Sequence, residues 1–539
     1  MADHLLEVRN LSVEFHTAAG VVHAVRDISY YLDRGETLAI LGESGSGKSV
    51  SSSAIMNLID MPPGRISSGQ ILLDGIDLMT MSPQARREVN GRRIAMIFQD
   101  PLSHLNPVYT VGWQIREALT THGSSTAEAA SEALRLLRRV GIPDPEPSMG
   151  KYPHEFSGGQ RQRVMIAMAL ALRPDLLIAD EPTTALDVTV QAEVLALLKE
   201  LQRETGMAVL IITHDLGVVS EIADRVVVME KGELVEAGTV REVYKNPRHP
   251  YTRKLIAAAP GKGEMHQPDA AGAPVLSVGD VRKSYGGFEA LKGVSFDLMA
   301  GETMAIVGES GSGKSTLARV LLRLDEPDAG SALWKGRDLF QLSPADLYKL
   351  RRDLQMVFQD PTQSLNPRMT VFQLVSEAWV IHPGIVPKAK WRERVAELLI
   401  QVGLQPDHMP RYPHQFSGGQ RQRIAIARAL ALEPQLIICD EAVSALDVSV
   451  QAQVIALLDK LRREMGIAFI FIAHDLPVVR DFADHVMVMQ KGKVVEQGTV
   501  REIFGSPRQE YTRALLAAGL DPDPDVQAAN RAARLARAS

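Results

Sequence analysis

The sequence predicts an α/β protein made of two copies of one domain. Each copy should hold a mainly parallel sheet core, an antiparallel β subdomain and a helical subdomain. Three observations predict this fold. The glycine-rich octapeptide GESGSGKS occurs twice, at residues 42–49 and 308–315. Apolar segments of strand length alternate with helical segments downstream of each copy, which favours a parallel sheet. Polar motifs after the octapeptides recur at a fixed interval of 260 residues, far longer than the period of a solenoid repeat.

The spacing also places the domain boundaries. Lys48 and Lys314 are 266 positions apart, whereas Gln99 and Gln359 are 260 apart, so six residues were gained or lost once. The chain has 539 residues, enough for more than one domain. We expect a first domain at 1–260, a Gly/Pro/Ala-rich flexible linker at 261–274 and a second domain at 275–519. The tail at 520–539 should be frayed and disordered or form a loose helix.

Hydrophobic patterning sets the expected elements of the first copy. A long helical segment, 101–173, should interrupt the alternation of strands and helices. The expected strands are 5–15, 24–32, 36–41, 175–179 and 207–213. One helix should follow Lys48, and two more should cover 190–204 and 216–224. A closing hairpin should cover 226–236.

Composition excludes several classes of protein. The formal net charge of −6 gives no basic footprint for nucleic acid. Cys439 is the one cysteine and lies in an apolar run, which predicts a buried strand thiol and excludes internal disulfides and multi-cysteine metal sites. The N-terminus lacks a signal-peptide pattern, and the longest apolar stretch, Val164–Leu172, is too short to span a bilayer. We therefore expect a chain that does not cross a membrane by itself.

Both octapeptides fit the phosphate-binding pattern G-x-x-x-x-G-K-[ST]. Glycines let backbone N–H groups turn toward phosphate oxygens. Lys48 and Lys314 should neutralise the β- and γ-phosphates, and Ser49 and Ser315 should place a hydroxyl on Mg²⁺. The candidate phosphate-binding residues are Gly42, Ser44, Gly45, Gly47, Lys48, Ser49 and Val50 in the first copy, and Gly308, Ser310, Gly311, Gly313, Lys314, Ser315 and Thr316 in the second.

Paired acids end an apolar strand in each copy, as Asp180-Glu181 and Asp440-Glu441. Two adjacent carboxylates at a buried strand end are costly unless a cation or phosphate chemistry uses them. The first acid of each pair suits Mg²⁺, and the second suits a general base for the attacking water. Gln99 and Gln359 also follow apolar runs, and their amides could reach Mg²⁺ and that water. Taken alone, either glutamine fits a satisfied polar residue at a strand end better than a metal ligand.

Two further motifs recur. Ser157-Gly158-Gly159-Gln160 and Ser417-Gly418-Gly419-Gln420 each open an apolar helix, where a serine cap and glycines expose N–H donors at the positive end of the helix dipole. An ordinary helix cap is the alternative. His214 and His474 each follow an apolar strand, 33 residues after the second acid, which favours contact with a γ-phosphate over a packed or surface histidine.

Together these residues resemble the ATP-binding cassette (ABC) ATPases over residues 5–260 and 275–519. The resemblance implies ATP and Mg²⁺ as ligands, with Glu181 and Glu441 as catalytic glutamates and His214 and His474 as switch histidines. It also implies that Phe15 and Tyr285 stack on adenine and that Ser49, Gln99, Asp180, Ser315, Gln359 and Asp440 serve the metal. In this family two cassettes face each other head to tail. Lys48 would then share one ATP with Ser417–Gln420, and Lys314 would share the other with Ser157–Gln160.

The segments QDPLSHLNP (99–107), QDPTQSLNP (359–367) and PRHPYTR (247–253) are similar to the dipeptide/oligopeptide importer branch. That branch implies an ATPase energising import of peptides or peptide-like solutes, such as microcin C-type substrates. Glutathione or nickel import is the alternative within the branch. The implied partners are two transmembrane permease subunits and an extracytoplasmic solute-binding protein, with no nucleic acid and one copy of this chain per complex. The implied location is peripheral, on the cytoplasmic side of the bacterial inner membrane.

Two soluble rivals fit less well. Twin-cassette translation factors carry a long, highly charged helical linker, whereas residues 261–274 are few and nearly neutral. Twin-cassette DNA-repair ATPases need zinc-binding cysteines that this sequence lacks.

Overall fold

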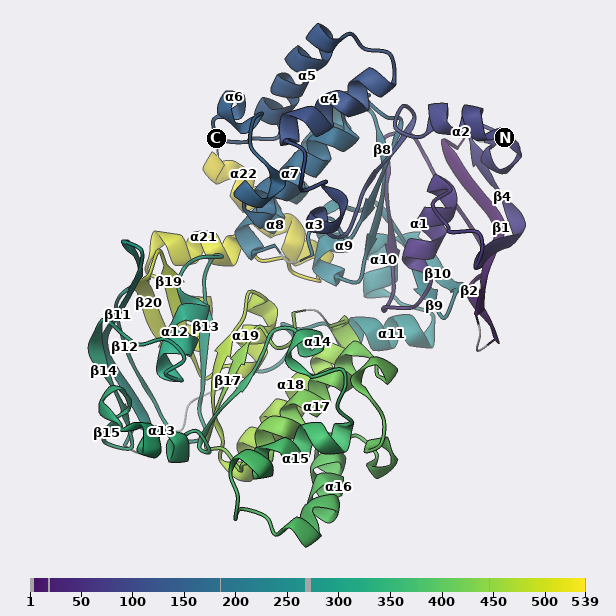
Figure 1. The fold of residues 1–539 in the computed structure, drawn as a ribbon. Coiled ribbons are helices and arrows are strands. Elements are labelled where there is room, and N and C mark those ends of the chain that lie inside the picture. The colour runs from purple at the N-terminus through teal and green to yellow at the C-terminus, as the bar shows by residue number, and fades with distance from the viewer. Residues whose placement is uncertain (1–3, 18–19, 185, 267–272, 445, 539) are drawn as a thin grey trace. The chain divides into compact units, whose positions relative to one another are not determined.

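The structure is a computed structural model that describes residues 4–17, 20–184, 186–266, 273–444 and 446–538. The chain forms two compact units (Figure 1). One comprises Met1–Ala259 together with Leu520–Ser539, and the other comprises Pro260–Gly519. Each unit is described separately below.

The first unit begins with an antiparallel sheet of strand order β2-β1-β4-β5. Its strands are β1 (Leu6–Thr17), β2 (Gly20–Leu32), β4 (Gly64–Leu73) and β5 (Ile76–Asp77). The sheet is the expected antiparallel β subdomain. The pattern analysis missed β4, because the sequence GRISSGQILL alternates poorly and carries two glycines and two serines.

The second sheet of this unit is six-stranded, in the order β10-β9-β3-β8-β7-β6. Neighbours are parallel except for the closing hairpin of β9 and β10, which confirms the predicted mainly parallel core. The strands are β3 (Thr37–Leu41), β6 (Ile94–Ile97), β7 (Leu176–Asp180), β8 (Ala208–Thr213), β9 (Arg225–Glu230) and β10 (Glu233–Thr239). Every residue of β3, β7 and β8 is buried, as expected of strands covered on both faces.

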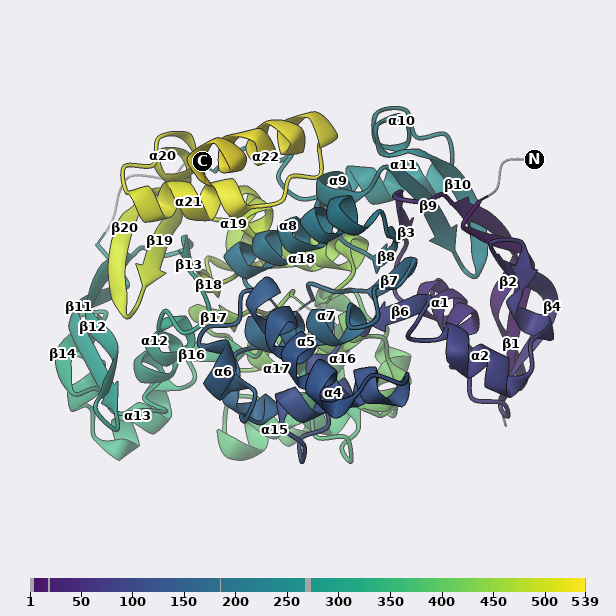
Figure 2. The same cartoon turned by 90° about the horizontal axis from the view of Figure 1, so that it is seen from above.

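Two helices begin shortly after parallel strands of this sheet, so their N-termini follow the carboxyl ends of those strands. The helix α1 (Lys48–Met56) leaves β3 through the glycine-rich loop, and α9 (Leu216–Ile222) follows β8. The interrupting segment is helical, as predicted, and α4, α5 and α7 lie together in it (Figures 1 and 2). The remaining helices are α2 (Pro83–Val89), α3 (Pro101–His104), α4 (Val111–Thr121), α5 (Thr126–Arg139), α6 (Pro145–Ser148), α7 (Gly158–Ala169), α8 (Val188–Thr205), α10 (Val240–Lys245) and α11 (Pro250–Ala257).

The second unit repeats this architecture. Its antiparallel sheet has the order β12-β11-β14-β15 and its main sheet the order β16-β17-β18-β13-β19-β20. The strands are β11 (Leu276–Tyr285), β12 (Phe288–Leu298), β13 (Thr303–Val307), β14 (Ala329–Trp334), β15 (Arg337–Asp338), β16 (Leu354–Val357), β17 (Leu436–Asp440), β18 (Ala468–Ile472), β19 (His485–Gln490) and β20 (Lys493–Thr499). Cys439 lies on β17 and is fully buried, as predicted, and this burial raises the pKa of its thiol.

The helices of the second unit follow the order of the first, except that a 3-10 helix, Pro406–His408, stands in place of α6. They are α12 (Lys314–Leu321), α13 (Pro344–Leu350), α14 (Pro361–Ser364), α15 (Val371–Ile381), α16 (Trp391–Gln401), α17 (Gly418–Leu430), α18 (Val448–Met465), α19 (Leu476–Phe482), α20 (Val500–Gly505) and α21 (Glu510–Ala518). In the described part of the chain, no helix combines the length and apolar character needed to span a bilayer.

The ends of the two predicted domains differ from expectation. The segment 520–539, expected to be either disordered or a loose helix, contains the helix α22 (Pro524–Ala538). That helix lies beside α9 (Figures 1 and 2). The physical reason is that polar side chains of α22 satisfy a buried carboxylate on α9, which sequence patterning cannot reveal. Of the expected flexible linker 261–274, residues 261–266 belong to the second unit, where Gly261 and Gly263 bind Asp481, and 267–272 lie outside the described residues.

Candidate functional site

The first glycine-rich loop connects β3 to α1 as predicted. The Nζ atom of Lys48 donates to the carbonyl oxygens of Gly42 and Glu43 at 2.7 and 2.8 Å. Lys48 is 5% exposed, yet its ammonium is held by carbonyl oxygens of the loop itself. The positive charge is therefore already placed inside the loop, at the N-terminus of α1, where anions are favoured.

Two of the loop glycines are required by geometry. Gly47 has φ +96°, and a Cβ there would lie 2.3 Å from the carbonyl oxygen of Ala24. Gly45 has φ +77°, with open space where its Cβ would be, so the loop leaves room on that side. The hydroxyl of Ser46 is buried and makes no hydrogen bond within the described residues. The loop thus has the shape and free donor capacity to cradle phosphate oxygens.

The paired acids lie at the carboxyl end of β7, next to this loop. Ser49 Oγ donates to Asp180 Oδ1 at 3.2 Å, which joins the two predicted metal-binding residues. Burial raises the pKa of Asp180 to about 6, although the hydrogen bond from Ser49 opposes this rise. A buried carboxylate next to a hydroxyl is a natural position for a divalent cation, which would favour the ionised form.

Glu181 is held by three side chains. Its Oε1 is 3.0 Å from His214 Nδ1, and its Oε2 accepts from Gln99 Nε2 at 2.7 Å and from Thr184 Oγ1 at 3.0 Å. Burial alone would raise the pKa of Glu181, but the hydrogen bond and charge of His214 outweigh burial and lower it. The structure therefore brings together the predicted general base, switch histidine and glutamine, and keeps the base ionised near neutral pH.

Both second acids have a strained backbone. Glu181 has φ +45° and Glu441 has φ +48°, values that cost a residue with a side chain roughly 1–3 kcal/mol. In each case the backbone N–H donates to the neighbouring strand, Glu181 to Ile212 O at 2.8 Å and Glu441 to Ile472 O at 2.9 Å. Left-handed residues of this kind cluster at functional sites, because the surrounding structure must hold them.

The second site resembles the first but differs in two contacts: His474 lies farther from the glutamate, and Ser444 Oγ donates to the backbone carbonyl of Glu441 at 3.0 Å instead of to its carboxylate. Gln359 Nε2 donates to Glu441 Oε2 at 2.6 Å, but His474 Nδ1 lies 3.7 Å from that oxygen. Burial alone would lower the pKa of His474, whereas the neighbouring carboxylate of Glu441 raises it. Lys314 donates to Gly308 O and Glu309 O at 2.8 and 3.0 Å, and Ser315 Oγ donates to Asp440 Oδ1 at 3.1 Å.

The predicted serine caps are confirmed as helix caps. Ser157 caps α7 and Ser417 caps α17, each in a capping box with Gln160 or Gln420. The second glycine of each motif is needed for close packing, since a Cβ on Gly159 would lie 2.4 Å from Val190 Cγ1. The first glycine is not crowded, and the nearest atom to a Cβ on Gly158 is Leu186 Cδ2 at 4.0 Å. Ser157 and Ser417 are exposed, so both motifs present helix N-termini to solvent.

The two predicted adenine-stacking residues occupy equivalent strand positions. Phe15 pairs with Val22 across β1 and β2, and Tyr285 pairs with Phe288 across β11 and β12. Their surroundings differ. Phe15 is partly buried against the core of its sheets, whereas Tyr285 is 44% exposed and its hydroxyl donates to Asp325 Oδ2 at 2.5 Å.

One pair of supporting residues carried no role in the sequence analysis. The hydroxyl of Tyr251 on α11 accepts from the N–H of Glu43 at 3.1 Å, and that of Tyr511 on α21 accepts from the N–H of Glu309 at 3.3 Å. Each tyrosine therefore supports its glycine-rich loop from the last helix of the same copy. Their recurrence at the 260-residue interval was the one sequence signal for this role.

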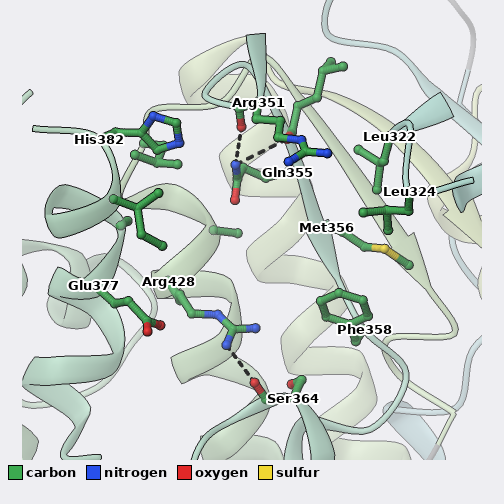
Figure 3. A pocket seen from close by; sticks show the side chains of 15 residues that line it. Leu322, Leu324, Arg351, Gln355, Met356, Phe358, Ser364, Glu377, His382 and Arg428 are labelled. Atoms are coloured by element: carbon green, nitrogen blue, oxygen red, sulfur yellow. Dashed lines mark hydrogen bonds between the residues drawn. The ribbon is translucent and has the colours of Figure 1, made fainter. Parts of the chain in front are cut away.

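A groove of about 400 Å³ lies in the second unit at the base of the Gln359 loop (Figure 3). Leu324, Met356 and Phe358 contribute apolar surface on one side, and Arg428 crosses the floor, where it donates to Ser364 O at 2.7 Å. Phe358 directly precedes Gln359, which holds Glu441. A group bound in this groove against Phe358 would therefore lie one residue from Gln359, the hydrogen-bond partner of Glu441.

No cluster of three or more His, Cys, Asp or Glu side chains suited to a metal occurs among the described residues. A single carboxylate with a serine hydroxyl, as at Asp180 and Ser49, is instead the protein share expected of a magnesium ion that is bound mainly through nucleotide phosphates.

Comparisons with known proteins give the family. The ABC transporter family model matches residues 25–184 and 291–444. The model for the oligopeptide/dipeptide transporter C-terminal region matches residues 235–274 and 495–538. The glutathione import ATP-binding protein GsiA of Escherichia coli O157:H7 is 48% identical over 98% of this chain and 92% of its own. The same-named protein of Salmonella paratyphi A is 49% identical over 96% of this chain and 90% of its own.

Among solved structures, cbiO1 of Clostridium perfringens, part of an ABC transporter complex, aligns with 44% of this chain and 92% of its own at 32% identity and a TM-score of 0.40. The family matches recur in both halves, in register with the duplicated sites. The chain therefore belongs to the ABC transporter family and is an ATPase with two ATP-binding cassettes of the peptide-importer type in one polypeptide.

Proposed function

We propose that this chain hydrolyses ATP at two sites to drive import of short peptides or peptide-like solutes, with glutathione as the first candidate. The observation that carries the proposal is the duplicated approach of a glutamine and a histidine to the strand-end glutamate, in two units that each hold a loop lysine on its own carbonyls. The near full-length similarity to proteins named for glutathione import supports the solute class. Other peptides and nickel are the alternatives within the same branch.

The contacts suggest what each side chain does. When ATP binds, the ammonium of Lys48 leaves the loop carbonyls and donates to the β- and γ-phosphates instead. Glu181, kept ionised by His214, accepts a proton from the attacking water. Gln99 and His214 hold the two oxygens of Glu181, so a shift in either side chain would turn the carboxylate toward or away from the water. Lys314, Glu441, Gln359 and His474 have the same tasks in the second site.

Magnesium fits the chemistry of the donors present. Ser49 with Asp180, and Ser315 with Asp440, would hold it, with the glutamines nearby. When bound, Mg²⁺ neutralises charge on the phosphate oxygens. Burial and the charge of Glu181 raise the pKa of Asp180 against the opposing effects of Ser49 and Lys48, and a bound cation would favour the ionised carboxylate.

We propose further that each ATP is shared between the loop of one cassette and the Ser-Gly-Gly-Gln motif of the other. The exposed N-termini of α7 and α17 are free to serve as the second wall of such a site. Lys48→Ala and Ser417→Ala should then act on one pocket, so that the double variant costs little more ATPase activity than either single variant. Strict additivity of the two losses would contradict the shared site.

The groove beside Phe358 is the proposed contact for a membrane subunit, specifically a short helix with an apolar face and an acidic side chain for Arg428. Such a contact would connect solute movement to Gln359 and hence to Glu441. It would also attach the chain peripherally to the cytoplasmic face of the inner membrane, through two permease subunits that receive solute from an extracytoplasmic binding protein. Leu324→Glu should abolish co-purification with the permeases while ATP binding by the isolated chain persists.

The deciding experiment is uptake by the reconstituted importer. We expect ATP-dependent accumulation of labelled glutathione, competed by short peptides and abolished by Glu181→Gln with Glu441→Gln. Uptake of nickel without competition from peptides would move the solute to the other candidate. Co-purification with ribosomes in place of permeases would overturn import altogether.

A further inference from the structure

The helix α9 follows the candidate switch histidine with one residue between them. Asp215 caps α9, and its Oδ1 accepts from the N–H groups of Gly217 and Val218 at 2.7 and 3.3 Å. His214 is thus joined rigidly to the first turn of α9. A change in the tilt of α9 would move His214 relative to Glu181, which it contacts at 3.0 Å.

The far end of α9 carries a buried carboxylate, and side chains near the end of the chain bind it. Glu221 is 4% exposed. Gln527 Nε2 and Arg534 Nη2 bind its two carboxylate oxygens, the latter at 2.7 Å, and Arg531 Nη1 donates to its backbone carbonyl at 2.8 Å. A buried carboxylate is costly unless it is paired, so Glu221 makes the docking of α22 specific.

Apolar and backbone contacts extend this attachment along α9. A Cβ on Gly217 would lie 2.8 Å from the Cβ of Leu520, so the absence of a side chain at Gly217 makes room for Leu520. Ser220 Oγ donates to Pro522 O at 2.8 Å, and Lys245 of α10 pairs with Asp523 at 2.7 Å. The segment 520–534 therefore contacts α9 from its first turn to its last.

The second unit repeats this arrangement with a different piece of chain. Asp481 on α19 stands 260 positions after Glu221. Its oxygens accept from the N–H groups of Gly261 and Gly263 at 2.6 and 3.1 Å. A Cβ on Gly261 would lie 3.3 Å from the Cβ of Pro477, the counterpart of Gly217. His266 continues the attachment, 3.0 Å from Arg462.

In both units, the segment that holds this helix comes from the chain just after the other cassette. Segment 520–534 follows α21, the last helix of the second cassette, yet belongs to the first unit. Segment 260–266 follows α11, the last helix of the first cassette, yet belongs to the second unit. In each unit, the helix after the histidine is held by the chain that has just left the other cassette.

We propose that Glu221 and Asp481 are positioning residues for ATP hydrolysis. Each clamps the segment that leaves the other cassette and thereby fixes the helix that sets its own histidine, His214 or His474. The two histidines are consequently linked through the polypeptide itself. This inference rests on the proposed role of the histidines, and it adds residues that lie outside both ATP sites.

The test is a cycle in the full-length chain between the clamp and the histidine. The double variant Gln527→Leu with Arg534→Leu removes two partners of Glu221. We expect ATPase kcat to fall about 3- to 10-fold and KM for ATP to change less than about 2-fold. The reason is that displacing a positioned group by about 1 Å can lower the rate up to about 100-fold. Arg87→Ala, an exposed arginine on α2, is the control and should leave kcat unchanged. In a His214→Ala background, the clamp variant should lower kcat by less than about 1.5-fold further, since both act through one group.

The outcomes separate two failures. If His214→Ala leaves ATPase activity intact, the proposed histidine role fails. If His214→Ala lowers activity but the clamp variant lowers it further by the same factor as in the native chain, the clamp does not act through His214 and the inference is overturned. Hydrogen exchange over residues 214–222 should increase in the clamp variant, and unchanged exchange would also overturn it.

An engineered disulfide between α9 and the segment 520–534 distinguishes loss of positioning from unfolding of the variant. Gly217→Cys with Leu520→Cys can form a disulfide if the two Cβ atoms separate by about 1 Å, and the one native cysteine, Cys439, is buried. Oxidation should restore kcat in the Gln527→Leu, Arg534→Leu background, and reduction should remove the rescue. A disulfide confirmed by mass spectrometry that fails to restore kcat would contradict the positioning role.

Discussion

Replacing Gly419 by alanine should destabilise the second unit, whereas the same change at Gly418 should not. Both glycines open α17, and both belong to the Ser-Gly-Gly-Gln motif. A Cβ on Gly419 would lie 2.1 Å from Val450 Cγ1 on α18, whereas a Cβ on Gly418 finds Leu446 Cδ2 at 3.8 Å. Only the first distance is well inside the 3.5–4.0 Å of an ordinary carbon–carbon contact.

The magnitude follows from this overlap. To accept Gly419→Ala, α17 and α18 must separate by more than about 1 Å or Val450 must leave its rotamer, and overpacking of this kind costs about 1–3 kcal/mol. Alanine favours a helix over glycine by up to about 1 kcal/mol at either position, so that gain largely cancels between the two variants. For a unit of this size, a difference of 1 kcal/mol shifts Tm by about 2–4 °C, so the two variants should differ by about 2–12 °C.

Thermal unfolding of the nucleotide-free chain measures the difference, with Gly158→Ala and Gly159→Ala as the matched pair in the first unit, where the distances are 4.0 and 2.4 Å. Val450→Ala should recover most of the stability lost in Gly419→Ala, because it removes the clashing Cγ1. Both alanines should lower ATPase activity, since a methyl group would cover N–H donors proposed for phosphate. Equal Tm values for the two variants, or no recovery with Val450→Ala, would refute the packing account of Gly419.

Two further predictions concern the acid pairs. Glu181→Gln with Glu441→Gln should retain ATP binding and reduce steady-state hydrolysis at least about 100-fold, measured by phosphate release, because an amide cannot accept the proton; hydrolysis at the native rate would remove the general-base role. Because burial raises the pKa of Asp180 to about 6, affinity for Mg²⁺ with ATP should be constant above pH 7 and fall up to tenfold per pH unit below 6, as protonation competes with the cation. Asp180→Asn should weaken metal binding and flatten that profile at the first site, and an unchanged profile would contradict the assignment.

Much of the fold was predictable because the sequence states it twice. The buried strands β3, β7 and β8 are continuous apolar runs that leave little alternative, and each ends at a motif whose chemistry is recognisable. The strand β4 was missed because the sheet is exposed on one side there and its residues carry weak strand preference. Tertiary pairing with β1 determines that segment, and single-sequence patterning cannot detect such pairing.

The site was predictable as a set of residues but not as a set of contacts. Spacing placed Gln99, Glu181 and His214 at strand ends, and parallel strands bring such ends to one edge of the sheet. That His214 and Gln99 each take a different oxygen of Glu181 depends on side-chain rotamers, which motifs do not encode. The role of α22 was hidden for a similar reason, because the apolar residues of 520–539 are mostly alanines. The attachment of the segment depends on polar and charged side chains that meet Glu221.

The strain at Glu181 and Glu441 connects these observations. A left-handed backbone at a glutamate persists only if the neighbouring structure holds it, and here each acid is held by its backbone bond to the next strand and by a side-chain contact with a histidine. Those strands, β8 and β18, continue through the histidines into α9 and α19. The same short stretch of chain therefore sustains the strained acid, carries the histidine and receives the segment from the other cassette. Loosening α9 should accordingly relax Glu181 as well as displace His214, so effects on the base and on the histidine should appear together.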